Sequence, residues 1–175
     1  MAYLALAYPE LKTEDYNWIQ SFRKDNDELY FKVVAPHFTI VFPTFNKSED
    51  EFIKSVEEKS MALKRITFAI RCSVINKDAL NDYWHVFLTP DEGNSEIIKL
   101  HDMLYSGELS DNLLLEIPFI PHIGIGNSKD KWICKKLIDD INERGINIKG
   151  SITQLDIVSY VDNEVKTIKK IELLK

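Results

Sequence analysis

The feature that most constrains the fold of this chain is an internal repeat. The fragment Pro-His-Phe-Thr-Ile at Pro36–Ile40 matches Pro-His-Ile-Gly-Ile at Pro121–Ile125, about half the chain further on. The context repeats as well, because Arg65–Thr67 follows the first fragment at nearly the distance at which Ser151–Thr153 follows the second. Only two copies are present, so the repeat predicts two similar lobes and not a solenoid.

Strands are expected where β-branched and aromatic residues gather. The expected strands are Tyr3–Tyr8, Val34–Phe42, Arg65–Ile75, Tyr83–Thr89, Phe119–Gly126, Ser151–Val161 and Val165–Leu173. With helices between several of them, the order strand, helix, strand, helix, strand occurs twice before a last strand. The sequence therefore predicts one α+β domain over residues 1–175. Its two pseudo-symmetric lobes, approximately 1–78 and 79–175, would each carry an antiparallel-rich sheet with flanking helices around a central cleft.

Capping signals locate the helices. Ser48 followed by Glu51 is typical of a capping box, in which the two residues satisfy each other's backbone N–H groups. Ser128 is expected to cap a helix that ends at Gly145. Two further helices are expected to begin at Thr13 and Ser95.

Composition limits the classes of function. The apolar first residues lack a basic leader and stop at Pro9, so they are expected to form a strand and not a membrane span. With no export signal and only Cys72 and Cys134, which offer no disulfide framework, a reducing compartment is expected, and the cytoplasm is the default. A monomer without membrane contact is also expected. The net charge of −6 and the pI near 5.3 argue against binding of long nucleic acid, which needs many Lys and Arg contacts to phosphate. A nucleotide or a short RNA end is compatible with them.

The repeated fragments place polar residues on one face of a strand. Alternate side chains of a strand point to opposite faces, so Phe38, Ile40 and Phe42 are expected to face the core. His37 and Thr39, together with Val41, would then face away from it. The first copy thus predicts a histidine and a hydroxyl side by side on one polar face.

The second copy repeats this arrangement with His122 and Gly124. Lobes related by an approximate twofold axis would place His37 and His122 on opposite walls of one cleft, on either side of one ligand. This geometry suits displacement at phosphorus, where the attacking and leaving oxygens lie roughly in line and each needs a proton-transfer partner. Histidine fits because its usual pKa of roughly 6.5 makes both protonation states accessible. Thr39 would donate a hydrogen bond to a phosphate oxygen.

A single His-x-Thr in a strand is weak evidence, because a partly buried histidine with a structural partner is commoner. Repetition changes this, since two of only four histidines follow proline at matching points of the repeat. The other two are expected to serve no catalytic role, His85 as a structural residue and His101 as a surface residue.

The paired fragments resemble the His-x-Thr/Ser motifs of the two-histidine phosphoesterases, the superfamily of RNA 2′,5′-ligase-like proteins and cyclic nucleotide phosphodiesterases. The resemblance covers nearly the whole chain. It implies two lobes around a cleft, catalysis without metal or cofactor, and substrates that are 2′,3′-cyclic, 1″,2″-cyclic or 2′-5′ phosphoesters. By motif, His37 and His122 match the catalytic histidines and Thr39 matches the phosphate-binding hydroxyl. Gly124 stands at the second phosphate-binding position, where a hydroxyl residue is usual.

Three other residues are candidate substrate contacts. Tyr8 ends the first expected strand, where the resemblance implies an aromatic residue near the base of the substrate. Arg71 alternates with apolar residues and could point into the cleft or into solvent. Asn127 closely follows the second motif, where a side chain or a helix N-terminus could contact an anion.

Two alternative functions are considered. A metal-dependent hydrolase needs clustered His, Asp, Glu or Cys side chains, and the histidine motifs carry no carboxylate at ligand spacing. The stronger alternative is a nucleotide-binding or RNA-end-binding module of the same fold that has weakened or lost turnover, because Gly124 lacks the second hydroxyl.

Overall fold

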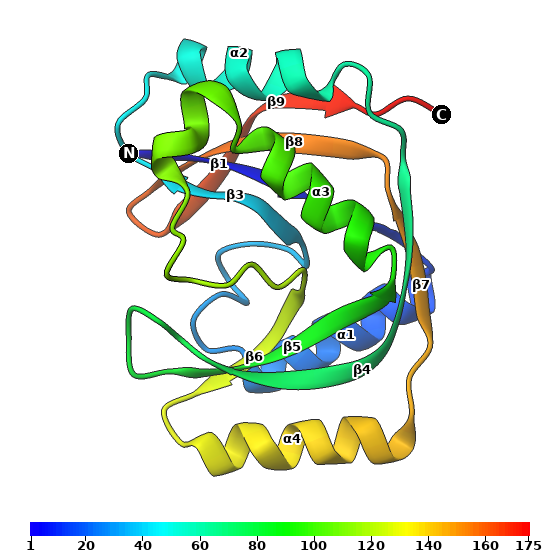
Figure 1. Ribbon diagram of the computed structural model, residues 1–175. Helices are drawn as coiled ribbons and strands as arrows, with labels where there is room; N and C mark the ends of the chain where they lie inside the picture. The colour runs from blue at the N-terminus through cyan, green and yellow to red at the C-terminus, as the bar shows by residue number, and fades with distance from the viewer.

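The computed structural model describes residues 1–175 as two curved sheets with helices on their outer sides (Figure 1). The first sheet, called sheet A, has the order β3-β1-β8-β9, and the second, sheet B, has the order β2-β7-β4-β5-β6. The strands are β1 (Ala2–Ala7), β2 (Glu10–Leu11), β3 (Phe38–Thr44), β4 (Ile66–Lys77), β5 (Trp84–Glu92), β6 (Ile123–Ser128), β7 (Ile148–Ile152), β8 (Gln154–Val161) and β9 (Glu164–Glu172). The expected α+β class with two antiparallel sheets is confirmed.

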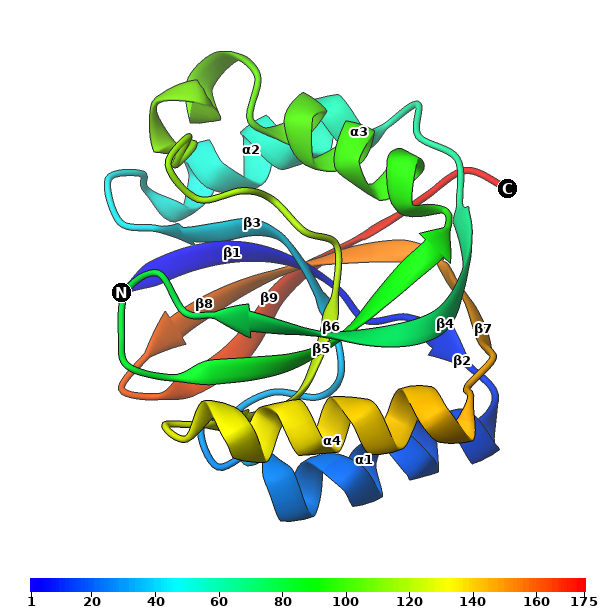
Figure 2. The ribbon, with the colours of Figure 1, turned by 60° about the horizontal axis from the view of Figure 1, so that its bottom comes forward.

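The helices cover the sheets from outside. They are α1 (Thr13–Asn26), α2 (Glu49–Ser60), α3 (Asn94–Leu104) and α4 (Lys131–Arg144), with a short 3₁₀ helix over Gly107–Asn112. Helix α2 lies on sheet A, and α3 packs against β3 and also reaches β4 and β5. Helices α1 and α4 lie next to each other on the outer side of sheet B, as Figure 2 shows.

The lobes do not coincide with the two halves of the sequence. Strand β4, from the first half, lies in sheet B, whereas β8, from the second half, pairs with β1 in sheet A. The predicted division into 1–78 and 79–175 therefore describes the sequence repeat but not the sheets. The symmetry itself is present, since β3-β1-β8 corresponds strand for strand to β6-β5-β4.

Local signals fix most helix ends. Ser48 and Glu51 form the expected capping box at the start of α2. Helix α4 begins two residues later than expected, because the carboxylate of Asp130 accepts the Trp132 N–H and so caps the helix. The Ser128 hydroxyl accepts the N–H of Asp130 instead. Gly145 ends this helix with a positive φ of 75°, which glycine adopts without steric cost.

Three expected strands have different limits. The expected strand Ser151–Val161 is two strands, because the chain passes from sheet B to sheet A at Thr153. Strands β3 and β6 begin only at Phe38 and Ile123, so each catalytic candidate directly precedes its strand. Val41 is buried and not on the polar face, because an extra residue between the pairs Ala5–Val41 and Leu6–Thr39 interrupts the alternation.

One continuous hydrophobic core joins the two sheets. Phe38 of sheet A packs edge-on against Phe68 of sheet B, with ring centroids 5.1 Å apart. Ile123 and Ile125 of β6 are fully buried in the same core. The apolar faces of both repeated fragments therefore hold β3 and β6 in place. No helix of the structure is long and apolar enough to cross a membrane.

Candidate active site

The two histidines occupy equivalent positions in the two sheets. His37 directly precedes β3, the edge strand of sheet A, and His122 directly precedes β6, the edge strand of sheet B. Each follows a buried proline, Pro36 or Pro121, and each is itself half-buried. An edge strand leaves one side free of a neighbouring strand, and each imidazole stands at the start of such a strand.

The same hydrogen bond orients both rings. Nδ1 of His37 lies 2.8 Å from the carbonyl oxygen of Ala35, and Nδ1 of His122 lies 2.6 Å from that of Ile120. A carbonyl oxygen can only accept, so each Nδ1 carries the hydrogen. The neutral ring then presents the lone pair of Nε2, which is the atom that a general base uses.

The surroundings keep both imidazoles neutral. Desolvation lowers the pKa of His37 to about 4, against the raising effect of its bond to Ala35. Desolvation likewise lowers the pKa of His122 to about 4, and the charge of His37 lowers it further. A charge on His37 therefore opposes a charge on His122. A bound anion would favour protonation of one of them.

Thr39 carries a hydroxyl next to its histidine, whereas Gly124, at the equivalent position, has no side chain. The Thr39 hydroxyl oxygen lies 3.1 Å from Nε2 of His37, so it borders the reactive nitrogen. At Gly124 a Cβ atom would meet no atom within 4 Å beyond the two neighbouring residues of the chain. The position of the missing hydroxyl is thus open space beside His122.

Tyr8 lies beside the first histidine. Its ring stands edge-on to His37, with centroids 6.1 Å apart. Desolvation, followed by the charge of Asp156, raises the pKa of Tyr8 to about 12, so its phenol stays protonated. The structure therefore places Tyr8, the residue directly after β1, next to a catalytic candidate, and its contact with a substrate base stays a prediction.

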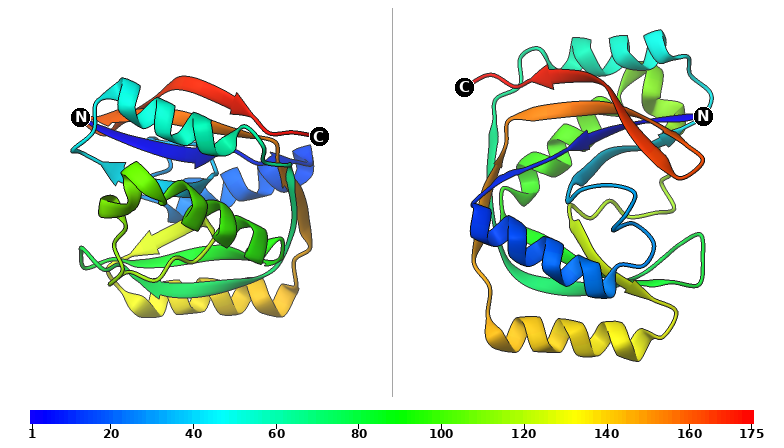
Figure 3. Two further views of the ribbon diagram at one scale, coloured as in Figure 1. Left: turned by 45° about the horizontal axis from the view of Figure 1, so that its top comes forward. Right: turned by 180° about the vertical axis from the view of Figure 1, so that it is seen from behind.

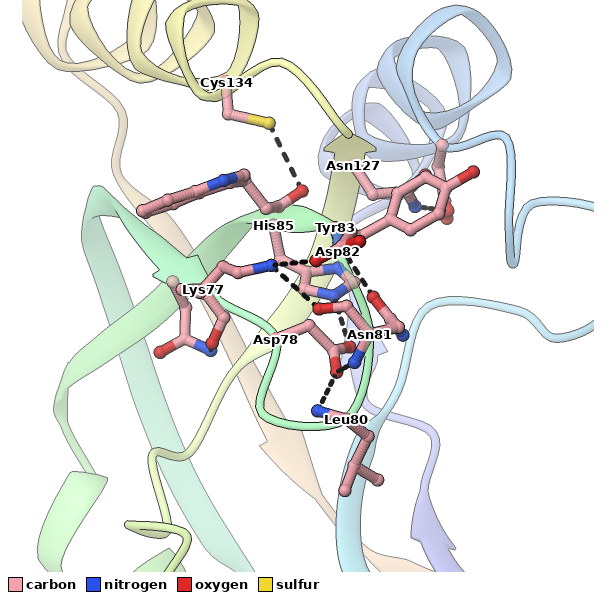
Figure 4. A network of polar contacts seen from close by, with 12 residues as sticks. Lys77, Asp78, Leu80, Asn81, Asp82, Tyr83, His85, Asn127 and Cys134 are labelled. Carbon is pink, nitrogen blue, oxygen red and sulfur yellow. Dashed lines mark hydrogen bonds and ion pairs between the residues drawn. The ribbon is translucent and has the colours of Figure 1, made fainter.

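A stack of rings stands behind His122. Phe87 of β5 lies flat against His122 with centroids 3.6 Å apart, and His85 lies 5.6 Å beyond Phe87. Nε2 of His85 is 2.8 Å from a carboxylate oxygen of Asp78, as Figure 4 shows at the turn between β4 and β5. His85 is buried with a structural partner, in agreement with its expected role. Phe87 was not among the candidates, although it follows His85 by two residues and so shares its face.

Two other candidates have different partners from those expected. Arg71 is exposed and forms ion pairs with Asp91, at 2.5 Å, and with Glu92, so its guanidinium is occupied at the surface. Asn127 is buried and donates to the carboxylate of Asp27 at 2.5 Å. The structure therefore gives both side chains protein partners in place of an anion.

The expectation that His101 is a surface residue is wrong. It is only 2% exposed, its Nδ1 lies 2.8 Å from the carbonyl oxygen of Ile40, and its ring stacks on Phe119 at 3.7 Å. His101 therefore anchors α3 to the strand that follows His37. No group of three or more His, Cys, Asp or Glu side chains is placed to hold a metal ion.

The lowered pKa values make stability depend on pH. An unfolded histidine has a pKa of roughly 6.5, whereas His37 and His122 fold with values of about 4. Between these values the unfolded chain binds more protons, so the free energy of unfolding should fall as pH is lowered from about 6.5 to about 4. Urea unfolding across this range measures the slope, which should be smaller in the double variant His37→Gln/His122→Gln. Equal slopes in both proteins would contradict the assignment.

Matching edge strands, each preceded by an oriented imidazole, define a two-lobed protein with one candidate histidine in each sheet. The family model of the 2′-5′ RNA ligase superfamily matches residues 11–164, and the chain belongs to this superfamily. The family expected from the histidine motifs is thereby confirmed.

Relatives and solved structures agree with this assignment. The chain is 26% identical over 166 residues to a protein of Bacillus licheniformis whose name places it among the phosphoesterases, covering 93% of this chain and 92% of the relative. A similarly named Geobacillus protein is 22% identical over 163 residues, with 93% and 90% covered. The fold resembles TT0787 of Thermus thermophilus with a TM-score of 0.62, at 11% identity and with 99% and 98% of the chains covered. It also resembles Escherichia coli LigT complexed with NADP⁺, with a TM-score of 0.59, at 14% identity and with the same coverage.

Proposed function

We propose that the chain is a metal-independent phosphoesterase that acts on a cyclic or 2′-5′ phosphoester of a nucleotide or RNA end. The observation that carries this proposal is the pair of equivalent imidazoles, His37 and His122, each held through Nδ1, with Nε2 of His37 next to the Thr39 hydroxyl. The names of the bacterial relatives support phosphoesterase chemistry in general. The NADP⁺ complex of LigT, a protein with the same fold, supports a nucleotide as the ligand.

Hydrolysis needs one neutral and one protonated imidazole. Nε2 of the neutral ring takes a proton from the attacking water as its oxygen forms a bond to phosphorus. The Nε2–H of the other ring gives a proton to the ester oxygen as its bond to phosphorus breaks. Binding of the anionic phosphoester between the rings raises the pKa of one of them, which supplies the protonated member. The near symmetry of the site leaves either histidine able to serve as the base.

The proposal is tested with a panel of 2′,3′-cyclic, 1″,2″-cyclic and 2′-5′ phosphoesters. Turnover is measured for each compound in the presence of a strong chelator, and binding is measured in parallel by thermal shift. Turnover of at least one class supports the proposal. The Gly124 position favours one alternative, a nucleotide-binding or RNA-end-binding module, and binding without turnover would establish that alternative instead.

Restoring the second hydroxyl should improve the site. Gly124→Thr places a side chain in open space on a strand, so it should be tolerated. A hydrogen bond to a charged phosphate oxygen contributes about 1.5–3 kcal/mol, which corresponds to a gain of about tenfold to a hundredfold in kcat/KM if fully realised. A water or a main-chain N–H that now serves the phosphate would reduce the gain.

The matched control is Gly124→Val, which has the shape of threonine without the hydroxyl. It should fold like Gly124→Thr but show no gain in kcat/KM. If both variants behave alike, and Thr39→Ala also changes nothing, the phosphate is not held by these two strand positions.

A further inference from the structure

A buried arginine near the end of α1 organises the segment that leads to His37. Arg23 is only 1% exposed. Its Nη2 donates to the carbonyl oxygens of Tyr30 at 3.1 Å and Val34 at 2.8 Å. Val34 directly precedes Ala35, whose carbonyl oxygen orients the ring of His37. Arg23 therefore fixes the backbone one residue away from the group that orients the first imidazole.

Asp27 joins this arginine to the same segment. One carboxylate oxygen accepts the Nε–H of Arg23 at 3.0 Å. The other oxygen accepts the backbone N–H of Tyr30 at 3.0 Å. Because the pair is almost entirely shielded from water, its geometry is far more restrictive than that of an ion pair at the surface.

Asn127 connects the Arg23–Asp27 pair to sheet B. Its Nδ2 donates to the second oxygen of Asp27 at 2.5 Å, across a hundred positions of sequence. Asn127 belongs to β6, the strand that follows His122 and carries Gly124. In the right-hand view of Figure 3, α1 (blue) lies in front of sheet B and its C-terminal end lies near β6 (yellow), with which α1 is in contact. One hydrogen-bonded chain thus runs from the segment before His37 to the strand after His122.

The pair also acts on His37 through its charges. The positive charge of Arg23 lowers the pKa of His37 and the negative charge of Asp27 raises it, so the two effects oppose each other. The other polar groups facing His37 are Tyr8, from the end of β1, and Thr39 on β3. A charge on His37 also lowers the pKa of His122.

We propose that Arg23, Asp27 and Asn127 are positioning residues of the phosphoesterase reaction, a buried network that holds the two histidine segments in register and balances charge beside His37. The inference rests on the proposed function, because it assigns these residues to that reaction. It explains why Asn127 and Asp27 pair with each other although they lie in different parts of the sequence. Neither Arg23 nor Asp27 needs to touch the substrate.

The charge balance is tested by NMR titration of the ring protons, which needs no substrate. The chain has only four histidines, so single His→Gln variants assign their signals. Asp27→Asn removes the charge that raises the pKa of His37, so that pKa should fall by about half a pH unit or more, while Asp27→Glu should retain it. The pH dependence of turnover should change as well: the part of the profile that reports the titration of His37 should move to lower pH by the same amount. An unchanged pKa of His37 in folded Asp27→Asn would overturn the electrostatic role.

The positioning role is tested with two asparagines that each tie a helix to sheet B. Asn127→Ala should lower kcat about tenfold or more with little change in KM, because a small displacement of one catalytic group is costly in the transition state. Asn142→Ala removes hydrogen bonds between α4 and Ser73 of β4. It should lower Tm without changing kcat. Equal kcat values in both variants would overturn the positioning role.

Failure of the proposed function would be recognised separately. A parent protein that turns over no phosphoester refutes that function and with it the assignment of the network to the reaction. The ring-proton shifts of His37 and His122 still decide whether the network exists as described. They should change in Asn127→Ala and stay constant in Asn142→Ala, and shifts that stay constant in both variants would show that the network does not position the rings.

Discussion

Replacement of either His37 or His122 by alanine is expected to reduce kcat by about 10²–10⁴-fold, because each imidazole transfers one proton in the proposed reaction. The double variant His37→Ala/His122→Ala should have a kcat only slightly below that of either single variant. The two imidazoles act as a unit, so the second has no role once the first is absent. The measurement is kcat on the best phosphoester of the panel. The pH profile of the parent should be bell-shaped, with one limb for each histidine.

Two controls accompany these variants. His101→Phe keeps a ring against Phe119 and removes an imidazole that bonds only to backbone, so it should retain turnover at some cost in stability. A strong chelator should leave the parent enzyme active. Loss of activity on chelation, with recovery on addition of zinc or manganese, would show that two imidazoles alone do not carry the chemistry.

Removal of the buried arginine should have the largest effect on stability. In Arg23→Met the carboxylate of Asp27 stays buried without its partner, and breaking a buried ion pair in this way typically costs about 3–5 kcal/mol. The side chains of Arg23 and Asp27 are only 2% and 3% exposed, so solvent offers little compensation. At about 2–4 °C per kcal/mol for a chain of this size, Tm should fall by about 6–20 °C. Urea unfolding measures the loss directly.

The double variant Arg23→Met/Asp27→Leu separates the charge from the contacts. It removes both charges, so part of the lost stability should return, while the backbone groups and the Asn127 amide that the pair bonded stay without partners. Lys24→Met, at the exposed neighbouring position, is the matched control and should change stability little. If Arg23→Met is no less stable than Lys24→Met, the pair contributes nothing to the fold.

The sequence predicted what depends on local pattern and on repetition. The capping box of α2, the end of α4 at Gly145 and most strands follow from residues that are close in the sequence. The repeated Pro-His fragments predicted two equivalent strands, and the structure places both at sheet edges. Their apolar residues Phe38, Ile40, Ile123 and Ile125 are buried, which explains why the apolar faces could be recognised from alternation alone.

What could not be predicted depends on contacts between distant segments. Arg23 and Asp27 are four residues apart, which is equally typical of an exposed helical pair, and only their burial distinguishes them. Asn127 looked available to a ligand because its partner lies a hundred positions earlier in the chain. His101 looked exposed because its neighbour Asp102 is charged, whereas the rings of Phe119 and Tyr105 cover it.

The exchange of strands between the halves determines when the site can form during synthesis. Strand β1 leaves the ribosome first, but its central partner β8 spans Gln154–Val161, near the end of the chain. Until then sheet A consists of β1 and β3 alone, and an isolated pair of strands is marginally stable at best. The strand that follows His37 therefore joins a stable sheet only after β8 has been synthesised. Such long-range pairing also favours slow folding, so a nascent chain stalled before Gln154 should contain no assembled site.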